Sequence, residues 1–271
     1  MEILNNCDTK DEFVKFGIDD LDNILNIQNR GNLIVVGGRP GMGKTTFAFN
    51  TILNSIKKGL PTLLFSLEMN KELCTTMLLS AETMIKIENI KKKKFNENEI
   101  AKLEQASHML ENDYKLIIDD TPGISVTALE ESCKKYKEEN DIKLVVIDYL
   151  QLMKGTGRAN SREQEFSEIS SILKNLAREL DITIILLTQL SRAVEARNNH
   201  RPKLSDIRES GAIEQDADIV IFLYRDEYYN QDTTDKNLAE AIVAKNRYGI
   251  NETIKFKFLP EYCKCRSLEN K

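Results

Sequence analysis

The sequence lacks the hydrophobic runs that a membrane protein needs. No apolar run approaches the roughly 18 consecutive residues of a membrane-spanning helix. Residues 1–7 contain no basic region followed by an apolar stretch, so they do not form a signal peptide. We therefore expect a cytoplasmic protein that has no membrane-spanning helix and no membrane partner.

Cysteine and histidine are also scarce. The chain has five dispersed cysteines and two histidines. An odd number of scattered cysteines in an intracellular chain predicts free thiols and not a disulfide framework. Cys263 and Cys265 are spaced like half of a metal site, but His108 and His200 are both distant in the sequence, which argues against zinc.

Positive charge is not in excess. The chain has 38 lysines and arginines against 43 aspartates and glutamates, and its net charge is −5. A protein that coats DNA through its charge needs a basic surface, so any contact with nucleic acid must come from a few placed groups. Four consecutive lysines at 91–94 are followed closely by glutamates, and we interpret them as a solvated helix start or loop.

The pattern of apolar segments predicts one α/β domain after a short arm. Residues 1–16 are polar and predict an N-terminal arm or linker remnant, whereas residues 17–271 contain no linker rich in proline, glycine or serine. We predict strands at 33–36, 62–66, 115–118, 143–147, 182–187, 218–223, 240–244 and 252–258. We predict helices at 44–58, 70–84, 97–111, 125–139, 162–180 and 208–214.

This alternation of strands and helices indicates a mostly parallel, twisted sheet flanked by helices. The early strands are continuous runs of valine, isoleucine and leucine, as expected when both faces of a sheet are covered. The last two predicted strands, joined around residues 248–251, are expected to form a C-terminal β-hairpin at the sheet edge. Ligands bind beyond the carboxyl ends of parallel strands, so the residues directly after each strand are candidate site residues.

A phosphate-binding loop follows the first predicted strand. Residues 38–45 match the pattern G-x-x-x-x-G-K-[ST], with the strand before and the helix after that this pattern requires. Glycines let backbone N–H groups surround an anion, and the helix start adds partial positive charge. We expect Lys44 to reach the β- and γ-phosphates of ATP and the Thr45 hydroxyl to hold Mg²⁺. The predicted nucleotide-binding residues are Gly38, Arg39, Pro40, Gly41, Met42, Gly43, Lys44, Thr45 and Thr46.

Acidic and amide side chains follow three further predicted strands. Asp148 follows four apolar residues, a pattern typical of an acid that holds Mg²⁺. Many P-loop enzymes carry a catalytic glutamate at the next position, where this chain has Tyr149. We therefore predict Glu68 as the base that activates water, although it could instead cap the following helix. Gln189 also ends a strand and is predicted to contact the γ-phosphate, with a surface turn residue as the alternative.

Two cations, Lys245 and Arg247, lie two residues apart at the end of a late strand. Side chains at this spacing share one face and can reach a single anionic target. Arginine suits the charge on a transferring phosphoryl group. The spacing leaves open whether both act in their own site, in a neighbour's site or as a solvated strand end. Basic loops at 155–162 and 191–211 could line the path of a polynucleotide or be ordinary surface loops.

These motifs together resemble the C-terminal RecA-like motor domain of the bacterial replicative helicase family, the DnaB family. The resemblance covers roughly residues 17–258, and the matching stretches follow the order of the family. They are 38–45, 65–69, 146–153, 188–192, 204–218 and 244–247.

The resemblance implies a ring hexamer that uses ATP to translocate on single-stranded DNA and to unwind duplex DNA in replication, as a helicase of the 5′–3′ type. It implies that Glu68 is the base, that Asp148 holds Mg²⁺ and that Gln189 senses the γ-phosphate. It places Lys245 and Arg247 at the site of the neighbouring subunit. The implied DNA-binding residues, acting largely through the main chain, are Arg208, Glu209 and Gly211.

The chain also departs from the family pattern. Family members usually carry an N-terminal helical domain and a linker helix, whereas about sixteen residues precede the match here. The family's usual serine in the loop is Gly41, and its Asn-Gly-Pro after the basic pair reads Tyr-Gly-Ile at 248–250. We expect a trimmed chain or a short phage-type or mobile-element relative, with a separate N-terminal collar, primase or loader as partner. A non-unwinding RecA-like ATP-binding assembly or accessory module is the alternative function.

Overall fold

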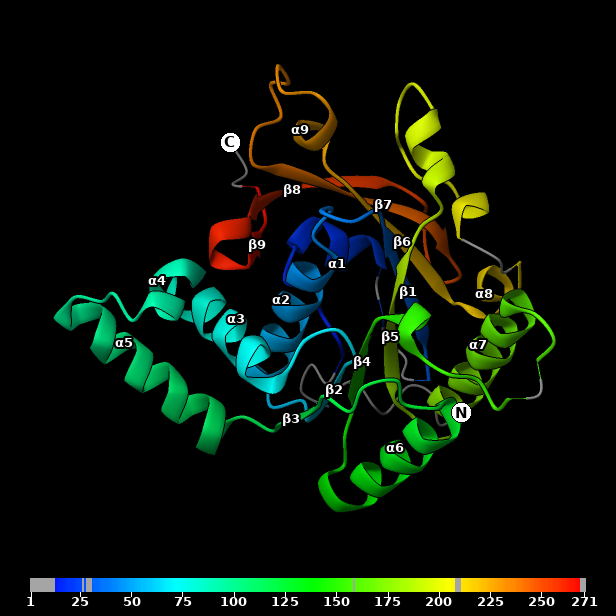
Figure 1. The fold of residues 1–271 in the computed structure, drawn as a ribbon, viewed down its shortest axis with the longest axis horizontal. Helices are drawn as coiled ribbons and strands as arrows, with labels where there is room; N and C mark the ends of the chain where they lie inside the picture. The colour runs from blue at the N-terminus through cyan, green and yellow to red at the C-terminus, as the bar shows by residue number, and fades with distance from the viewer. Residues whose placement is uncertain (1–12, 26, 28–30, 158, 208–210, 269–271) are drawn as a thin grey trace, which may run out of the picture.

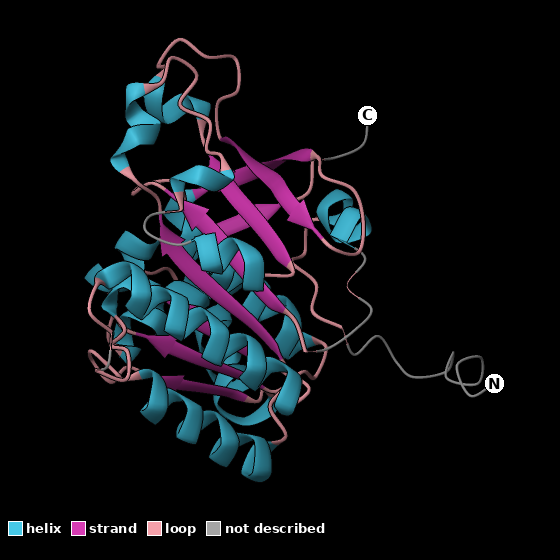
Figure 2. Cartoon of the chain, turned by 90° about the vertical axis from the view of Figure 1, so that its right-hand side faces the viewer, coloured by secondary structure: helices cyan, strands magenta, loops and turns pink. Residues whose placement is uncertain are grey.

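The structure is a computed structural model that describes residues 13–25, 27, 31–157, 159–207 and 211–268. Within these residues, a nine-stranded sheet has the order β3-β2-β4-β5-β1-β6-β7-β8-β9, and helices pack on both of its faces (Figures 1 and 2). The strands are β1 (Leu33–Gly38), β2 (Thr62–Ser66), β3 (Leu116–Asp119), β4 (Leu144–Asp148), β5 (Thr183–Gln189), β6 (Ile219–Tyr224), β7 (Leu238–Asn246), β8 (Thr253–Leu259) and β9 (Lys264–Arg266).

In sheet order, the six strands β3, β2, β4, β5, β1 and β6 pair in parallel, which confirms the predicted mostly parallel sheet. Successive side chains of a strand point to opposite faces, so a strand that is covered on both faces must be apolar throughout. In β1, Leu33 and Val35 enter one core cluster, whereas Ile34 and Val36 enter the other. The continuous apolar runs of the sequence are therefore the consequence of helix layers on both faces.

The helices form two layers, one on each face of the sheet (Figure 1). The first core cluster contains side chains from α1 (Asp19–Leu25), α2 (Lys44–Lys57) and α3 (Lys71–Thr83). The second contains side chains from α6 (Val126–Asn140), α7 (Arg162–Glu179) and α8 (Gly211–Asp216). The remaining helices are α4 (Ile87–Lys92), α5 (Glu97–His108), which continues into a π-helical turn at Met109–Asp113, and α9 (Asp226–Tyr229).

The longer predicted helices and all predicted strands are present, but several short elements are not foreseen by the sequence pattern. These are α1, α4, α9 and β9, each too short to show a clear period of apolar residues. The lysines at 91–94 are exposed as predicted, but they lie at the end of α4 and in the following loop, not at a helix start. Of the helix predicted at 208–214, residues 208–210 lie outside the described residues.

The C-terminal strands extend the sheet by antiparallel pairing. β7 and β8 form the predicted hairpin, and β9 pairs with β8 beyond it, so β9 and not the hairpin is the edge of the sheet. At the other end of the chain, Val14 and Phe16 belong to the segment predicted as an arm, and their side chains are buried in the core. In the described part of the chain, no helix is long and apolar enough to span a membrane.

Candidate nucleotide-binding site

The phosphate loop connects β1 to α2 and bends tightly around two glycines. Gly41 and Gly43 have φ values of 80° and 92°, in the left-handed region where glycine is favoured. Neighbouring rings also leave no room for a side chain. A Cβ at Gly43 would lie 2.4 Å from an edge carbon of Phe258, and a Cβ at Gly41 would lie 2.7 Å from the ring of Tyr228. The loop shape therefore depends on glycine at both positions.

Lys44 begins α2, and its ammonium group folds back over the loop. Its Nζ donates hydrogen bonds to the carbonyl oxygens of Gly38 at 2.9 Å and Arg39 at 3.3 Å. Burial lowers the pKa of Lys44 to about 8, and the nearby charges of Asp148 and Glu68 partly oppose this shift. An anion bound at the loop would favour the charged ammonium, so the buried cation is suited to hold a phosphate.

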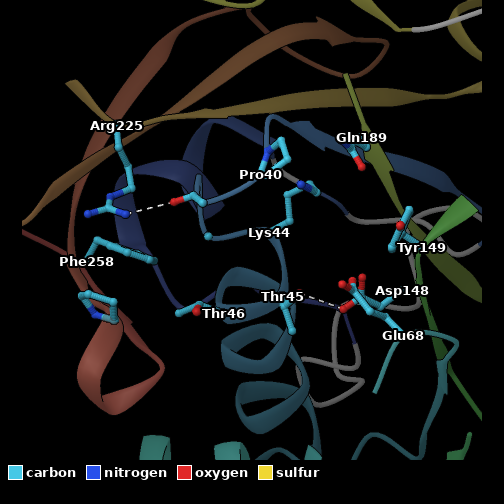
Figure 3. A pocket seen from close by; sticks show the side chains of 13 residues that line it. Pro40, Lys44, Thr45, Thr46, Glu68, Asp148, Tyr149, Gln189, Arg225 and Phe258 are labelled. Carbon is cyan, nitrogen blue, oxygen red and sulfur yellow. Dashed lines mark hydrogen bonds between the residues drawn. The ribbon is translucent and has the colours of Figure 1, made fainter. Parts of the chain in front are cut away.

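Asp148 ends β4 beside the loop and is 2% exposed. The Thr45 hydroxyl donates a hydrogen bond to its Oδ2 at 2.8 Å (Figure 3). Burial raises the pKa of Asp148 to about 6, the Thr45 hydrogen bond opposes the shift, and the charge of Glu68 adds to it. The two residues predicted to hold Mg²⁺ are thus adjacent. The Thr45 hydrogen bond and the charge of Lys44 do not fully offset the cost of burying the charged Asp148 carboxylate.

Glu68 and Gln189 reach the same place from two other strands. Glu68 follows β2 and Gln189 ends β5, and both line a cavity of about 490 Å³ together with Lys44, Thr45 and Asp148 (Figure 3). Because the carboxyl ends of parallel strands meet at one edge of the sheet, residues from four separate segments converge here. The structure therefore brings together the predicted base, the predicted phosphate sensor and the loop.

A glutamine that the motif analysis did not single out braces this wall of the cavity. The Gln151 amide donates to the Thr188 hydroxyl at 2.9 Å and to the Gln189 carbonyl at 3.1 Å. Its Oε1 accepts a hydrogen bond from the Gln189 backbone N–H at 3.2 Å. No spacing rule connects residues 151 and 189, because their contact arises from the pairing of neighbouring β4 and β5.

The opposite wall of the cavity comes from the antiparallel part of the sheet. Arg225 follows β6 and donates to the Gly41 carbonyl at 2.9 Å, while its guanidinium lies 4.5 Å from the centre of the Phe258 ring (Figure 3). Pro260 also lines this wall, whereas Tyr149, which follows Asp148, lines the cavity on the side of Gln189 (Figure 3). Sequence reasoning missed Arg225 and Phe258 because their place beside the loop depends on the position of β8 in the sheet.

The remaining loop residues differ in their placement. Pro40 and Thr46 line the cavity, whereas Met42 is 2% exposed and packs in the core. Arg39 turns its side chain away, toward Glu195. The predicted nucleotide-binding segment thus contains side chains that face the cavity and side chains that anchor the loop from behind.

Lys245 and Arg247 do not line the cavity of their own chain. The Lys245 ammonium donates to the Glu214 carbonyl at 2.6 Å, and Arg247 donates to the Gln215 carbonyl at 2.7 Å and to Asp218 at 3.2 Å. Both cations therefore meet the carbonyl end of α8. The Asp218 backbone N–H donates to the Leu33 carbonyl, at the opposite end of β1 from the phosphate loop.

The predicted DNA-binding segment is only partly described. Arg208 and Glu209 lie outside the described residues. Gly211 is the exposed first residue of α8, and a Cβ built on it meets no atom of the described residues within 4 Å. The same helix ends at the carbonyls that hold Lys245 and Arg247.

A comparison with known families identifies the chain. The profile of the DnaB-like helicase C terminal domain matches residues 14–267. This chain belongs to that family. The predicted resemblance and the predicted RecA-like fold are therefore confirmed.

Individual relatives agree with this assignment. The chain is 44% identical to the Replicative DNA helicase DnaB of Geobacillus stearothermophilus over 273 residues, which cover all of this chain and 60% of that protein. The solved structure of the ATPase Domain of G40P is 39% identical with a TM-score of 0.90 and is covered to 91%, with 94% of this chain aligned. A DnaB-like replicative helicase, solved in a study of its interactions with primase, is 38% identical with a TM-score of 0.90; 94% of this chain covers 62% of it. The chain thus spans about 60% of the length of such full relatives.

Proposed function

We propose that this chain is the ATP-hydrolysing motor of a replicative DNA helicase, with residues 17–271 as the motor domain, to whose core the predicted N-terminal arm contributes Val14 and Phe16. The observation that carries the proposal is the convergence of Lys44, Glu68 and Asp148 on one cavity beside a phosphate loop. A cation for phosphates, a buried acid for a metal and an exposed acid for water are the groups that ATP hydrolysis needs.

Asp148 and Thr45 fit the needs of Mg²⁺. Their donor atoms are a carboxylate oxygen and a hydroxyl oxygen, 2.8 Å apart, and Mg²⁺ prefers oxygen ligands. A divalent cation would also compensate the negative charge of Asp148, whose burial raises its pKa. When bound, Mg²⁺ supplies neutralisation of the charge on the β- and γ-phosphate oxygens. Lys44 adds a second positive charge on the same phosphates.

Glu68 performs the proton transfer in this proposal. A water oxygen attacks the γ-phosphorus, its proton passes to the Glu68 carboxylate, and the bond to the bridging oxygen breaks with its electron pair leaving on ADP. The exposure of Glu68 allows water to reach it, whereas Asp148 is enclosed. Gln189 lines the same cavity, and in this proposal its amide contacts the γ-phosphate.

The nucleobase occupies the other wall of the cavity in this proposal. Arg225 and Phe258 already stack on each other beside the loop. A flat guanidinium and an aromatic ring can both stack on a base, and neither requires a particular base. The cavity is therefore divided into a phosphate side and a base side.

Lys245 and Arg247 act at the cavity of a neighbouring subunit in a ring of six. Their own cavity lies at the other end of β1, which spans six residues or roughly 16 Å. No side chain bridges this distance while also contacting the carbonyls of α8. Their place at the chain's opposite edge supports an arrangement in which each site is shared by two subunits.

DNA in this proposal passes along the segment that precedes α8, with Arg208, Glu209 and Gly211 as main-chain contacts. The solved relative that was studied with primase supports a primase as one partner class. An N-terminal collar or a loader is the other partner class in this proposal.

The test measures ATP hydrolysis over a wide range of protein concentration, with and without single-stranded DNA. Shared sites predict a rate per subunit that rises with concentration and with DNA, and particles of six subunits by mass. Displacement of one strand of a forked duplex then tests unwinding, with the N-terminal region of a full relative added in trans. Hydrolysis and assembly without any displacement would favour the non-unwinding assembly instead.

A further inference from the structure

The chain leaves β5 at Gln189 and returns to the same place at Ile207. Leu190 and Ile207 form a β-bridge, and the Ser191 N–H donates to the Asp206 carbonyl at 2.9 Å. Within the loop, Arg197 clasps the Asp206 carboxylate with both terminal nitrogens, one of them at 3.0 Å. Residues 190–207, here called the 190–207 segment, are therefore a closed and internally braced unit.

Two residues of the phosphate loop, Gly38 and Arg39, contact this segment. The Leu190 N–H faces the Gly38 carbonyl at 3.4 Å. The Arg39 side chain donates to the Leu190 carbonyl at 2.9 Å, and its Nε and Nη2 both donate to Oε1 of Glu195 at 2.9 and 2.8 Å. Arg39 is 7% exposed. Its guanidinium is thus fixed between the end of β5 and the 3-10 turn at Arg192–Ala196.

The same two loop residues hold the phosphate-binding lysine. The carbonyls of Gly38 and Arg39 accept the hydrogen bonds of the Lys44 ammonium. A phosphate that binds this ammonium competes with both carbonyls for its protons. Nucleotide binding therefore acts on the backbone of the residues that also contact the 190–207 segment.

The far side of the segment is attached to the sheet. Arg201 makes a two-pronged ion pair with Glu240 of β7, at 2.7 and 3.0 Å. Glu240 is buried, so this attachment is held in place by the sheet. Because the segment is internally braced, a displacement at Glu195 is expected to be transmitted through the segment and not absorbed at Glu195 alone.

We propose that the Arg39–Glu195 ion pair is a positioning contact that couples occupancy of the phosphate loop to the conformation of the 190–207 segment. The proposal rests on the proposed nucleotide binding at this loop and names the route by which that binding leaves the cavity. Arg39 acts through Glu195 and does not need to touch the nucleotide with its side chain. Coupling of this kind requires a contact that responds to both ends, and this pair has the loop on one side and the segment on the other.

The experiment is hydrogen exchange read by mass spectrometry, with and without a non-hydrolysable ATP analogue and Mg²⁺. In the unaltered chain, we expect the analogue to change exchange in peptides of the 190–207 segment. In Glu195→Ala, this change falls by about five- to tenfold, whereas the affinity for the analogue stays within about threefold. Glu195→Gln keeps an oxygen acceptor for Arg39 and retains more of the change. Glu179→Ala serves as the matched control, because it removes an exposed glutamate of α7 that pairs with Lys134 of α6.

Each result has one meaning. Absence of analogue binding in the unaltered chain overturns the proposed function as well. Normal binding without a change in the 190–207 segment overturns the coupling alone, as does a full change in Glu195→Ala. Thermal unfolding separates coupling from a merely structural role, because Glu195 is 45% exposed and its removal is expected to leave the unfolding temperature nearly unchanged. A large fall in unfolding temperature together with loss of analogue binding also counts against the proposal.

Discussion

The parallel and antiparallel parts of the sheet place the charged side chains predicted for the site at opposite edges. In the parallel part, the carboxyl ends of β1, β2, β4 and β5 meet at one edge, and their following residues gather Lys44, Glu68, Asp148 and Gln189 around one cavity. In the antiparallel part, β7 runs the other way and delivers Lys245 to the opposite edge. Strand direction alone thus decides which charges share a cavity.

This difference separates the groups that surround the phosphate loop from the cation Arg247, which lies at the opposite edge of the sheet. The phosphate side has the loop, the pair proposed to hold Mg²⁺ and the proposed base, whereas Arg247, proposed to stabilise the transferring phosphoryl group, lies at the far end of the chain's own sheet. Arg225 is near the loop, but it is stacked on Phe258 and bonded to the Gly41 carbonyl. Under the proposed function, the site within one chain binds ATP but needs an arginine from a neighbouring subunit for catalysis.

Arg247→Ala gives the largest expected effect. We expect kcat for ATP hydrolysis to fall by about 10³-fold or more, because an arginine at the transferring phosphoryl group contributes on this scale. Nucleotide affinity changes little, since the loop belongs to the other part of the sheet. Steady-state hydrolysis and equilibrium binding of a fluorescent nucleotide measure the two effects separately. A parallel loss of affinity would show that the two edges are not independent.

Mixing subunits tests whether the missing arginine comes from a neighbour. Rings of Arg247→Ala subunits and rings of Glu68→Gln subunits are each expected to be inactive. In a random equal mixture, roughly a quarter of the interfaces join an intact loop and base to an intact Arg247, if each site lies between two adjacent subunits. Hydrolysis should return to a similar fraction. No recovery in rings shown by mass to be mixed would contradict the proposal that Arg247 acts at the cavity of a neighbouring subunit.

The sequence predicts the parallel part better than the antiparallel part. The loop, Asp148 and Glu68 each follow directly from a local pattern, namely a glycine turn, an acid after four apolar residues and an acid after a strand. Their meeting point follows from the rule for parallel strands. Local patterns and one topological rule were sufficient for these residues, whereas the contact of Gln151 with Gln189 on the same wall depends on the pairing of β4 with β5.

The other wall depends on contacts that no local pattern encodes. Arg225 directly follows β6 and Phe258 lies on β8, more than thirty residues away and with β7 between the two strands in the sheet, so their stacking depends on the order of the C-terminal strands. The position of Lys245 depends on the irregular pairing between β6 and β7 near Val220, which shifts the register. Arg39 fits the loop motif, but its partner Glu195 is found only when the 190–207 segment folds back on β1.

We expect Asp148→Asn, on the phosphate side of the cavity, to lose ATP hydrolysis and to make the folded chain more stable. Burial raises the pKa of Asp148 from 3.8 to about 6, so the charged form is costly in the folded state. The folded state is not penalised below pH 4, where Asp148 is protonated in both the folded and the unfolded chain. Its stability falls as the pH rises through 6, because the buried carboxylate must then carry a charge. The variant should therefore match the unaltered chain near pH 4 and exceed it by on the order of 2 kcal/mol at pH 7.

Thermal unfolding across this pH range without nucleotide measures the difference. Asp113→Asn, at an exposed carboxylate, is the control for loss of one charge. Mg²⁺-dependent hydrolysis should be lost in Asp148→Asn. A variant that is less stable at pH 7 would mean that the Thr45 hydrogen bond outweighs burial.

Arg225→Ala gives the smallest expected effect and tests the base side of the cavity. Removing the guanidinium leaves Phe258 as a stacking surface and releases the Gly41 carbonyl, so we expect KM for ATP to rise by about tenfold with kcat nearly unchanged. This pattern is that of a contact made equally in the ground state and the transition state. Arg225→Lys keeps the charge but loses the flat stacking surface, so it separates the two contributions. A fall in kcat with unchanged KM would instead place Arg225 on the catalytic side, and the shared-site arrangement would lose its main support.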